Sequence, residues 1–140
     1  MNGGYHYLTS SKLLAQGSRP PVGVRLPFDV IVLSAREYQP AMPGYEVMHV
    51  PIDDANPSHA DRTRIRSAAQ AVAWHVRAGR RVLVTCHQGR NRSGVIAGLA
   101  LVELGMPRNQ AVRLIRTLRN GLTNSHFYAM VKGTPPPEES

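Results

Sequence analysis

The single cysteine of this 140-residue chain opens a segment whose residues can bind and attack a phosphate group. The segment follows an apolar run at 81–85, precedes another at 95–104, and reads Cys86-His87-Gln88-Gly89-Arg90-Asn91-Arg92-Ser93. Attack on phosphorus needs inward-facing backbone N–H groups, a helix N-terminus, a fixed cation and a nucleophile at the centre. The segment supplies each part, so the sequence predicts a phosphate-binding loop that carries a nucleophile.

Four residues of this segment have distinct expected roles. Gly89 permits the unusual backbone angles of a tight cradle, and Arg92 can bind two phosphate oxygens at once and stabilise their charge in the transition state. Cys86 lies in a positive field that favours its reactive thiolate form. Ser93 can donate to that thiolate and ease its departure as a leaving group. The substrate-binding residues of the loop are expected to be His87, Gln88, Gly89, Arg90 and Asn91.

The elements that must position this loop follow from apolar periodicity along the chain. Short apolar runs predict strands at 28–33, 45–52 and 81–85. Apolar residues at helical spacing predict helices over 58–78, from about 92 to 104, over 108–119 and over 125–132. Strands that alternate with helices predict a three-layer α/β/α fold with a mostly parallel central sheet, in which ligands bind outside the carboxyl ends of strands.

The two ends of the chain differ from this body. Residues 1–21 are polar and punctuated by Gly and Pro, so they are expected to be irregular apart from a short strand near Tyr7 and Leu8. Residues 133–140 contain three consecutive prolines and are expected to be disordered. Length and composition fit one domain, which we expect to span residues 1–132.

The charge balance indicates an anionic partner. Basic residues outnumber acidic ones by 17 to 9, and fifteen of the 17 are arginine, whose planar fork of donors binds phosphate. Arg113, Arg116 and Arg119 recur at every third position of one predicted helix, either as a solvated face or as a nucleic-acid surface. A solvated, arginine-rich surface is the alternative for the whole chain, since net charge reports association and not fold.

Several other classes of protein are not indicated. No apolar run approaches the roughly 20 residues of a membrane span, and the N-terminal residues lack the regions of a secretory signal, so a cytoplasmic protein is expected. The lone cysteine excludes an intrachain disulfide and Cys-rich zinc frameworks. The histidines lack the spacing of zinc enzymes, so the expected site uses neither a metal nor another cofactor. A monomer is expected.

The spacing of Cys86, Arg92 and Ser93, after a buried strand and before a helix, resembles the C-x5-R-[S/T] signature of the cysteine-dependent protein phosphatases. The acidic candidates precede the cysteine, as in the dual-specificity type, and the resemblance covers roughly residues 25–130. It implies hydrolysis of phosphate monoesters on phosphotyrosine, phosphoserine or phosphothreonine proteins through a cysteinyl-phosphate intermediate. Nothing in the chain resembles the phosphotyrosine-recognition loop of larger enzymes, which implies a shallow pocket.

The resemblance also implies roles outside the loop. Asp54, 32 residues before Cys86 and at the end of a predicted strand, matches the aspartate that protonates the leaving oxygen, with Asp53 as the alternative. Either aspartate could instead cap the strand end or the helix that follows. Asn124 matches an asparagine that supports the phosphate loop, or it caps a helix.

Departures from the family pattern bear on activity and substrate. Thr85 stands where the family usually has a histidine that helps to keep the thiolate stable, and it offers a hydroxyl but no imidazole. A phosphate-binding module with weak catalysis is therefore the competing hypothesis. His87 and Arg90 resemble the basic loop of phosphoinositide phosphatases, and residues 91–94 resemble a motif of the RNA 5′-triphosphatases. An anionic lipid head group or an RNA 5′ end is thus an alternative to a phosphorylated protein as the partner.

Overall fold

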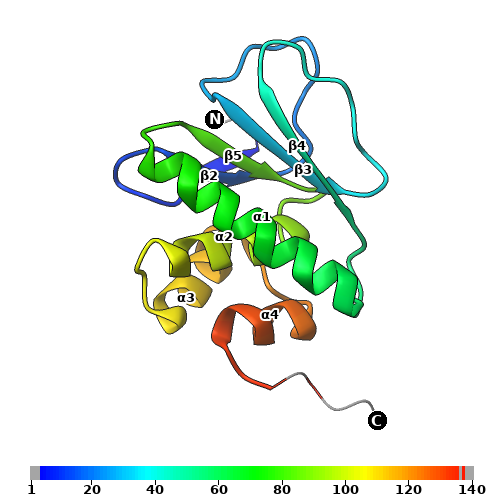
Figure 1. Ribbon diagram of the computed structural model, residues 1–140, viewed down its shortest axis with the longest axis vertical. Helices are drawn as coiled ribbons and strands as arrows, with labels where there is room; N and C mark the ends of the chain where they lie inside the picture. The colour runs from blue at the N-terminus through cyan, green and yellow to red at the C-terminus, as the bar shows by residue number, and fades with distance from the viewer. Residues whose placement is uncertain (1–3, 136, 138–140) are drawn as a thin grey trace.

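The computed structural model describes residues 4–135 and 137 (Figure 1). Among these residues the chain forms, in order, β1 (Tyr5–Tyr7), β2 (Leu14–Gly17), β3 (Val30–Ala35), β4 (Glu46–Ile52), α1 (His59–Arg77), β5 (Val82–Thr85), α2 (Arg92–Glu103), α3 (Arg108–Arg119) and α4 (Ser125–Lys132). The strands predicted at 28–33, 45–52 and 81–85 and all the predicted helices are present, with small differences at their ends.

The strands form one sheet in the order β1-β2-β5-β3-β4. β1 pairs antiparallel with β2, and the other neighbouring pairs are parallel. This confirms the predicted α/β fold with a mostly parallel central sheet. The carboxyl ends of β2, β5, β3 and β4 therefore lie side by side at one edge, where a ligand is expected to bind.

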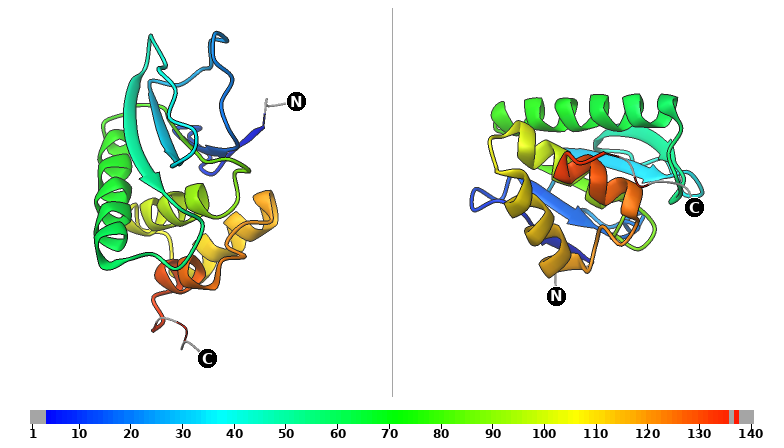
Figure 2. Two further views of the ribbon diagram at one scale, coloured as in Figure 1. Left: turned by 90° about the vertical axis from the view of Figure 1, so that its right-hand side faces the viewer. Right: turned by 90° about the horizontal axis from the view of Figure 1, so that it is seen from below.

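The helices cover only one face of the sheet, as the views in Figures 1 and 2 agree. Val82 and Val84 of β5 pack into a core with side chains of all four described helices, whereas Leu83 between them packs on the opposite face. That opposite face is covered by side chains such as Leu26 and Met42, from the connections that precede β3 and β4. The layer that was expected to be helical on this side is made of coil.

The handedness of the crossovers explains this one-sided arrangement. The connections from β2 to β3 and from β3 to β4 step in one direction across the sheet, and the connection from β4 to β5 steps back. Right-handed crossovers that step in opposite directions must pass over opposite faces. Because α1 lies in the β4-to-β5 crossover, it covers one face, and the two coil connections cover the other.

The N-terminal segment corrects the prediction of an irregular chain over residues 1–21. The expected short strand is present as β1, but Gln16 and Gly17, which read as a loop, belong to β2 between β1 and β5. Leu14 and Ala15 of β2 are fully buried, so burial and strand pairing outweigh the local preference for a turn. Residues 1–3 and the tail residues 136 and 138–140, part of the expected disordered tail, lie outside the described residues.

Local signals set the ends of the helices. Ser58 Oγ caps α1 by accepting from the Asp61 N–H at 3.1 Å, and Gly79 takes a φ of 80° just beyond its other end. The Asn124 side chain caps α4 by accepting from two N–H groups of its first turn. None of the helices in the described part of the chain is long and apolar enough to cross a membrane.

An ion pair joins the amino ends of β3 and β5. Asp29 Oδ2 accepts from the Arg81 backbone N–H at 2.9 Å and from its Nε at 3.1 Å, and Oδ1 accepts from Nη2 at 3.0 Å. These hydrogen bonds from Arg81 lower the pKa of Asp29 to about 2. The ionised carboxylate is therefore favoured by folding.

We expect Asp29→Asn to weaken the dependence of the free energy of unfolding on pH in the acid range. A carboxyl whose pKa falls on folding stabilises the native state at pH values above its pKa in the unfolded chain, 3.8. This stabilisation is lost as the pH falls through the folded pKa of about 2. Because the pair is partly exposed, the wild type should lose only about 1 kcal/mol more than the variant on acidification. Thermal unfolding at stepped pH measures the difference, and parallel profiles would contradict this role of Asp29.

Candidate active site

Residues 86–91 link β5 to α2, and together with Arg92, the first residue of α2, they form a segment that we call the Cys86 loop. The loop borders a cavity of about 180 Å³. The predicted nucleophile, the preferred acid and most of the predicted substrate-binding residues line this cavity together: Asp54, Cys86, His87, Gln88, Arg90, Asn91 and Arg92. Gly89 and Ser93, which complete the predicted set, are buried and do not line the cavity.

Two side chains hold the middle of the Cys86 loop from outside. The Gly89 carbonyl accepts from Gln16 Nε2 on β2 and from Arg119 Nε on α3, each at 3.1 Å. Arg119 Nη2 also donates to the Gln88 carbonyl at 3.5 Å. Burial in this position lowers the pKa of Arg119. The loop is thus fastened to β2 on one side and to α3 on the other.

Backbone groups hold the flanking carbonyls in the same way. His87 O accepts from the Arg19 N–H at 3.2 Å, and Arg90 O accepts from the Leu122 N–H at 3.3 Å. In a trans peptide the N–H points away from the preceding carbonyl, so outward carbonyls at 87–90 turn the N–H groups of 88–91 toward the cavity. Within residues 4–135 and 137, those N–H groups have no hydrogen-bond acceptor. A ring of such N–H groups is a binding site for an anion.

Glycine is required at position 89 for two reasons. Its φ is 71°, in the left-handed region that disfavours other residues. A Cβ there would lie 2.7 Å from the backbone carbon of Gly17 and 2.7 Å from the nitrogen of Ser18. Glycine is therefore needed at position 89 both for its backbone angles and because the backbone at the end of β2 lies too close for a Cβ.

Cys86 and Ser93 face each other below the cavity. The Cys86 Sγ lies 3.2 Å from the Ser93 Oγ, and the two residues are 4% and 0% exposed. Ser93 lies in the first turn of α2, whose N-terminal end adds a partial positive charge. The structure thus places the predicted nucleophile beside the hydroxyl that was expected to assist it.

Arg92 is held by a carboxylate that sequence reasoning did not identify. Glu37 Oε1 and Oε2 accept from its Nη1 and Nη2 at 2.6 and 2.7 Å, and Nη1 also donates to Ile52 O at 3.2 Å. The hydrogen bonds from Arg92 lower the pKa of Glu37 to about 2, and the pair raises the pKa of Arg92. The edge of the guanidinium that carries Nε–H and the second Nη2 hydrogen remains available for an anion.

The position of Glu37 just after a predicted strand could have identified it as a site residue. Glu37 follows the carboxyl end of β3, as Asp54 follows the carboxyl end of β4, its neighbour in the sheet. Parallel neighbours bring such residues to the same edge. Glu37 Oε2 also lies 3.4 Å from the His87 Nδ1, so a carboxylate faces this loop histidine.

The two candidate acids take different positions. Asp54 lines the cavity with Cys86, and its carboxylate accepts from Asn91 Nδ2 at 2.9 Å and from Asn124 Nδ2 at 2.8 Å. Asp53 is exposed, pairs with Arg36 at 3.1 Å and does not line the cavity. The geometry therefore favours Asp54 as the acid.

Asn91 and Asn124 connect Asp54, the candidate acid, to the Cys86 loop. Asn91 Oδ1 accepts from the backbone N–H groups of Thr123 and Asn124 at 2.8 and 3.1 Å. Asn124 also caps α4 and donates to Ala55 O at 3.0 Å. The loop, the acid segment and the start of α4 are thus joined by one hydrogen-bond network.

Thr85, the departure from the family pattern, does not turn its hydroxyl into the loop. Its Oγ1 donates to the Val32 carbonyl at 2.7 Å, and its own carbonyl accepts from Ser34 Oγ at 2.6 Å. The hydroxyl hydrogen is committed to β3, so Thr85 cannot donate it toward Cys86. Hydrogen bonding near the thiol therefore comes from Ser93.

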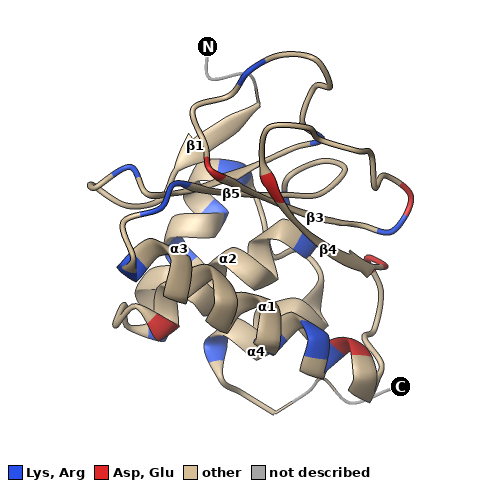
Figure 3. Cartoon of the chain, turned by 45° about the horizontal axis from the view of Figure 1, so that its top comes forward, with Lys and Arg blue, Asp and Glu red and all other residues tan. Residues whose placement is uncertain are grey.

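The predicted arginine stripe on α3 does not act as one surface. Arg119 turns to the Cys86 loop, Arg116 lies over the Tyr128 ring at 4.2 Å, and Arg113 is exposed. Figure 3 shows Lys and Arg positions spread over loops and helices. The contacts of Arg119 and Arg116 give each a local structural partner.

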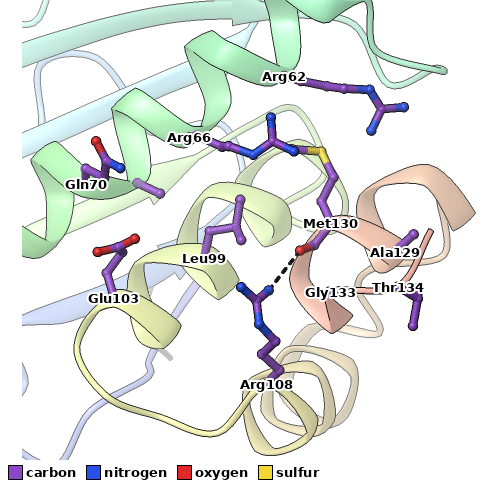
Figure 4. A pocket seen from close by; sticks show the side chains of 11 residues that line it. Arg62, Arg66, Gln70, Leu99, Glu103, Arg108, Ala129, Met130, Gly133 and Thr134 are labelled. Atoms are coloured by element: carbon purple, nitrogen blue, oxygen red, sulfur yellow. Dashed lines mark hydrogen bonds between the residues drawn. The ribbon is translucent and has the colours of Figure 1, made fainter. Parts of the chain in front are cut away.

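A second cavity, of about 330 Å³, lies between α1, α2 and α4 (Figure 4). Two of its arginines already have partners, since Arg62 donates to Asn56 Oδ1 at 3.2 Å and Arg108 donates to the Met130 carbonyl at 3.2 Å. None of the predicted catalytic residues lines it. In the part of the chain that the structure describes, no group of three His, Cys, Asp or Glu side chains is arranged to hold a metal ion.

Comparison with solved structures identifies the fold. A mutant form of Tk-PTP matches with a TM-score of 0.78 at 22% identity, over 95% of each chain. A mouse dual specificity phosphatase complexed with zinc tungstate matches with a TM-score of 0.77 at 23% identity, over 95% of this chain and 86% of that chain. Human DUSP28 matches with a TM-score of 0.74 at 23% identity, over 89% of this chain and 88% of that chain.

No family model matches the sequence, and no curated protein matches it either. The structural neighbours nevertheless share one architecture over nearly the whole chain. The chain therefore has the fold of the dual-specificity phosphatases. This confirms, at the level of the fold, the resemblance that the spacing of Cys86, Arg92 and Ser93 predicted.

We expect Gly89→Ala to weaken anion binding at the Cys86 loop at least tenfold, because a Cβ at 89 collides with the β2 backbone and must displace the loop. Gly79→Ala is the matched control, since Gly79 also has a positive φ, of 80°, but nothing lies within 4 Å of its Cβ position. Each variant should lose about 1 kcal/mol of stability from the left-handed backbone, and Gly89→Ala should lose more because of the collision. Titration with inorganic phosphate, followed by NMR, measures the affinity, and equal affinities in the two variants would contradict the requirement.

Proposed function

We propose that the protein is a metal-independent cysteine phosphatase that hydrolyses phosphate monoesters through a cysteinyl-phosphate intermediate. One observation carries the proposal: Cys86 and Asp54 line one small cavity beside the N–H groups of residues 88–91, which have no acceptor within the described residues. Those N–H groups and the free edge of Arg92 can bind the oxygens of a phosphate dianion. The fold shared with dual-specificity phosphatases supports the same activity.

In the first half-reaction, the Cys86 thiolate attacks phosphorus and forms the S–P bond as the bond to the ester oxygen breaks. The electron pair of that bond stays with the ester oxygen, which takes a proton from the Asp54 carboxyl and leaves as an alcohol. Arg92 and the loop N–H groups stabilise the charge on the three other oxygens. Glu37 fixes the plane of the Arg92 guanidinium while this happens.

In the second half-reaction, water attacks phosphorus and gives a proton to the Asp54 carboxylate. The S–P bond breaks, its electron pair returns to Cys86 Sγ, and inorganic phosphate leaves. Ser93 Oγ, at 3.2 Å from Sγ, donates a hydrogen bond to the departing thiolate. Asp54 thus acts first as an acid and then as a base, which its place on the cavity wall permits.

Phosphotyrosine and phosphoserine or phosphothreonine proteins are the substrates that we propose. The cavity of about 180 Å³ has room for a phosphate group, which side chains of both kinds carry. A second candidate rests on Arg90, which lines the cavity and whose side chain has no partner within the described residues. Arg90 favours substrates with a further anionic group, such as a phosphoinositide head group or an RNA 5′ end.

Phosphate release from an aryl phosphate, in chelator and reductant, tests the activity. The wild type should turn over, and Cys86→Ser should lose turnover by at least a thousandfold while it still binds inorganic phosphate, because a serine hydroxyl is a far weaker nucleophile than a thiolate. Undiminished turnover in Cys86→Ser would contradict the mechanism. Binding of phosphate without turnover in the wild type would instead favour a phosphate-binding module.

We expect Asp54→Asn to slow esters with poor leaving groups by about 10²–10⁴-fold and activated aryl esters far less, because only the former need a proton on the leaving oxygen. Asp53→Asn is the control, since Asp53 pairs with Arg36 away from the cavity. The comparison of kcat/KM for an alkyl and a nitrophenyl ester measures the difference. Equal losses on both esters would remove Asp54 from the acid role.

A further inference from the structure

Gln16 on β2 is a buried polar residue that has no role in the proposed mechanism. It is 0% exposed, and its Nε2 donates to Gly89 O and to Ser93 Oγ, each at 3.1 Å. Both acceptors are more than 70 residues away in the chain, and one of them is the hydroxyl beside Cys86. Because a carbonyl cannot donate, the Gly89 contact fixes which end of the Gln16 amide faces the loop.

The Gln16 N–H decides the direction of the Ser93 hydroxyl. A serine hydroxyl has one hydrogen to donate, and Ser93 Oγ already accepts from Gln16. The Cys86 thiol donates to the same oxygen at 3.2 Å. Once Cys86 is ionised its sulfur can only accept, and the Ser93 hydrogen is then free to point at Sγ. Without Gln16, the carbonyl of Gly89, four residues before Ser93, becomes a competing acceptor of the kind that serine uses at helix starts.

We propose that Gln16 is a positioning residue, which directs the Ser93 hydroxyl toward Cys86 and so speeds the breakdown of the cysteinyl-phosphate. This inference rests on the proposed function, in which Ser93 stabilises the departing thiolate. Gln16 touches neither substrate nor phosphorus and acts through Ser93. Its effect should be confined to the step in which the S–P bond breaks and the electron pair returns to Sγ.

The burial of Gln16 argues against a purely structural role. Its Oε1 is buried and has no hydrogen-bond partner in the described part of the chain, an arrangement that disfavours the folded state. In Gln16→Met, Gly89 O keeps the donor Arg119 Nε, and Ser93 keeps Cys86 as a neighbour, so no polar group loses its last partner. We therefore expect Gln16→Met to fold with a stability close to that of the wild type, because removal of the unpartnered Oε1 offsets the loss of the two donated hydrogen bonds.

Rapid-quench kinetics with nitrophenyl phosphate tests the inference. Gln16→Met should show a burst of nitrophenol of about one per Cys86, followed by a steady-state kcat about tenfold below wild type, the size expected for one hydrogen bond to a charged group. Measured on the pH plateau of Cys86 alkylation, the rate of the burst should stay within about twofold of wild type, because the thiolate is then fully formed in both proteins. Gln70→Met, an exposed substitution on α1, is the control and should leave both phases unchanged.

A double-mutant cycle separates positioning from general damage to the loop. If Gln16 acts through Ser93, Ser93→Ala should slow the breakdown of the cysteinyl-phosphate. Adding Gln16→Met to Ser93→Ala should then slow it further by less than about twofold. The inference would be overturned if the loss of kcat in the double variant equalled the product of the two single losses, or if Gln16→Met left kcat unchanged.

Alkylation of Cys86 by iodoacetamide supplies a readout that needs no turnover. The pH at half-maximal alkylation rate should rise in Gln16→Met and in Ser93→Ala alike, because each weakens the hydrogen bond to the thiolate. A wild type without turnover would count against the proposed function, whatever the alkylation shows. If the wild type turns over substrate and Gln16→Met matches it in both the rapid-quench kinetics and the pH dependence of alkylation, only the role of Gln16 would be rejected.

Discussion

The site depends on one constraint: the carbonyl groups of residues 87–90 must point away from the cavity. Each of these carbonyls has a donor outside the loop, from Gln16, Arg119 or a neighbouring backbone N–H. A hydrogen bond of this kind contributes about 1 kcal/mol net, so the set together holds a conformation that a free loop would not keep. Because the peptide groups are planar, the same bonds turn the following N–H groups toward the anion.

The sheet order turns this loop into a site with four converging elements. β2, β5, β3 and β4 are adjacent, and their carboxyl ends deliver Gln16, Cys86, Glu37 and Asp54 in that order. Gln16 donates to the loop, Cys86 begins it, Glu37 fixes its arginine, and Asp54 lines the same cavity and accepts from Asn91. The right-handed crossover from β4 to β5 places α1 on one face of the sheet, and α2, α3 and α4, which follow β5, pack on the same face.

The sequence predicted the parts whose signals are local and missed those that depend on pairing. The helices and three of the strands follow from apolar periodicity, and the residues of the Cys86 loop from their spacing. β2 has only four residues and ends in Gln16-Gly17, so its strand character comes from β5 and β1 and not from its own composition. Gln16 was missed with its strand, and Glu37 was missed because its partner Arg92 is 55 residues away.

Direct detection of the covalent intermediate tests the central claim that this edge of the sheet performs nucleophilic catalysis at Cys86. The wild type is mixed with an aryl phosphate, quenched in acid within milliseconds and analysed by peptide mass spectrometry. We expect one phosphoryl group on the peptide that contains Cys86, and none on the same peptide of Cys86→Ser. Rapid turnover with no phosphoryl group on that peptide, in Gln16→Met as well as in wild type, would contradict the account.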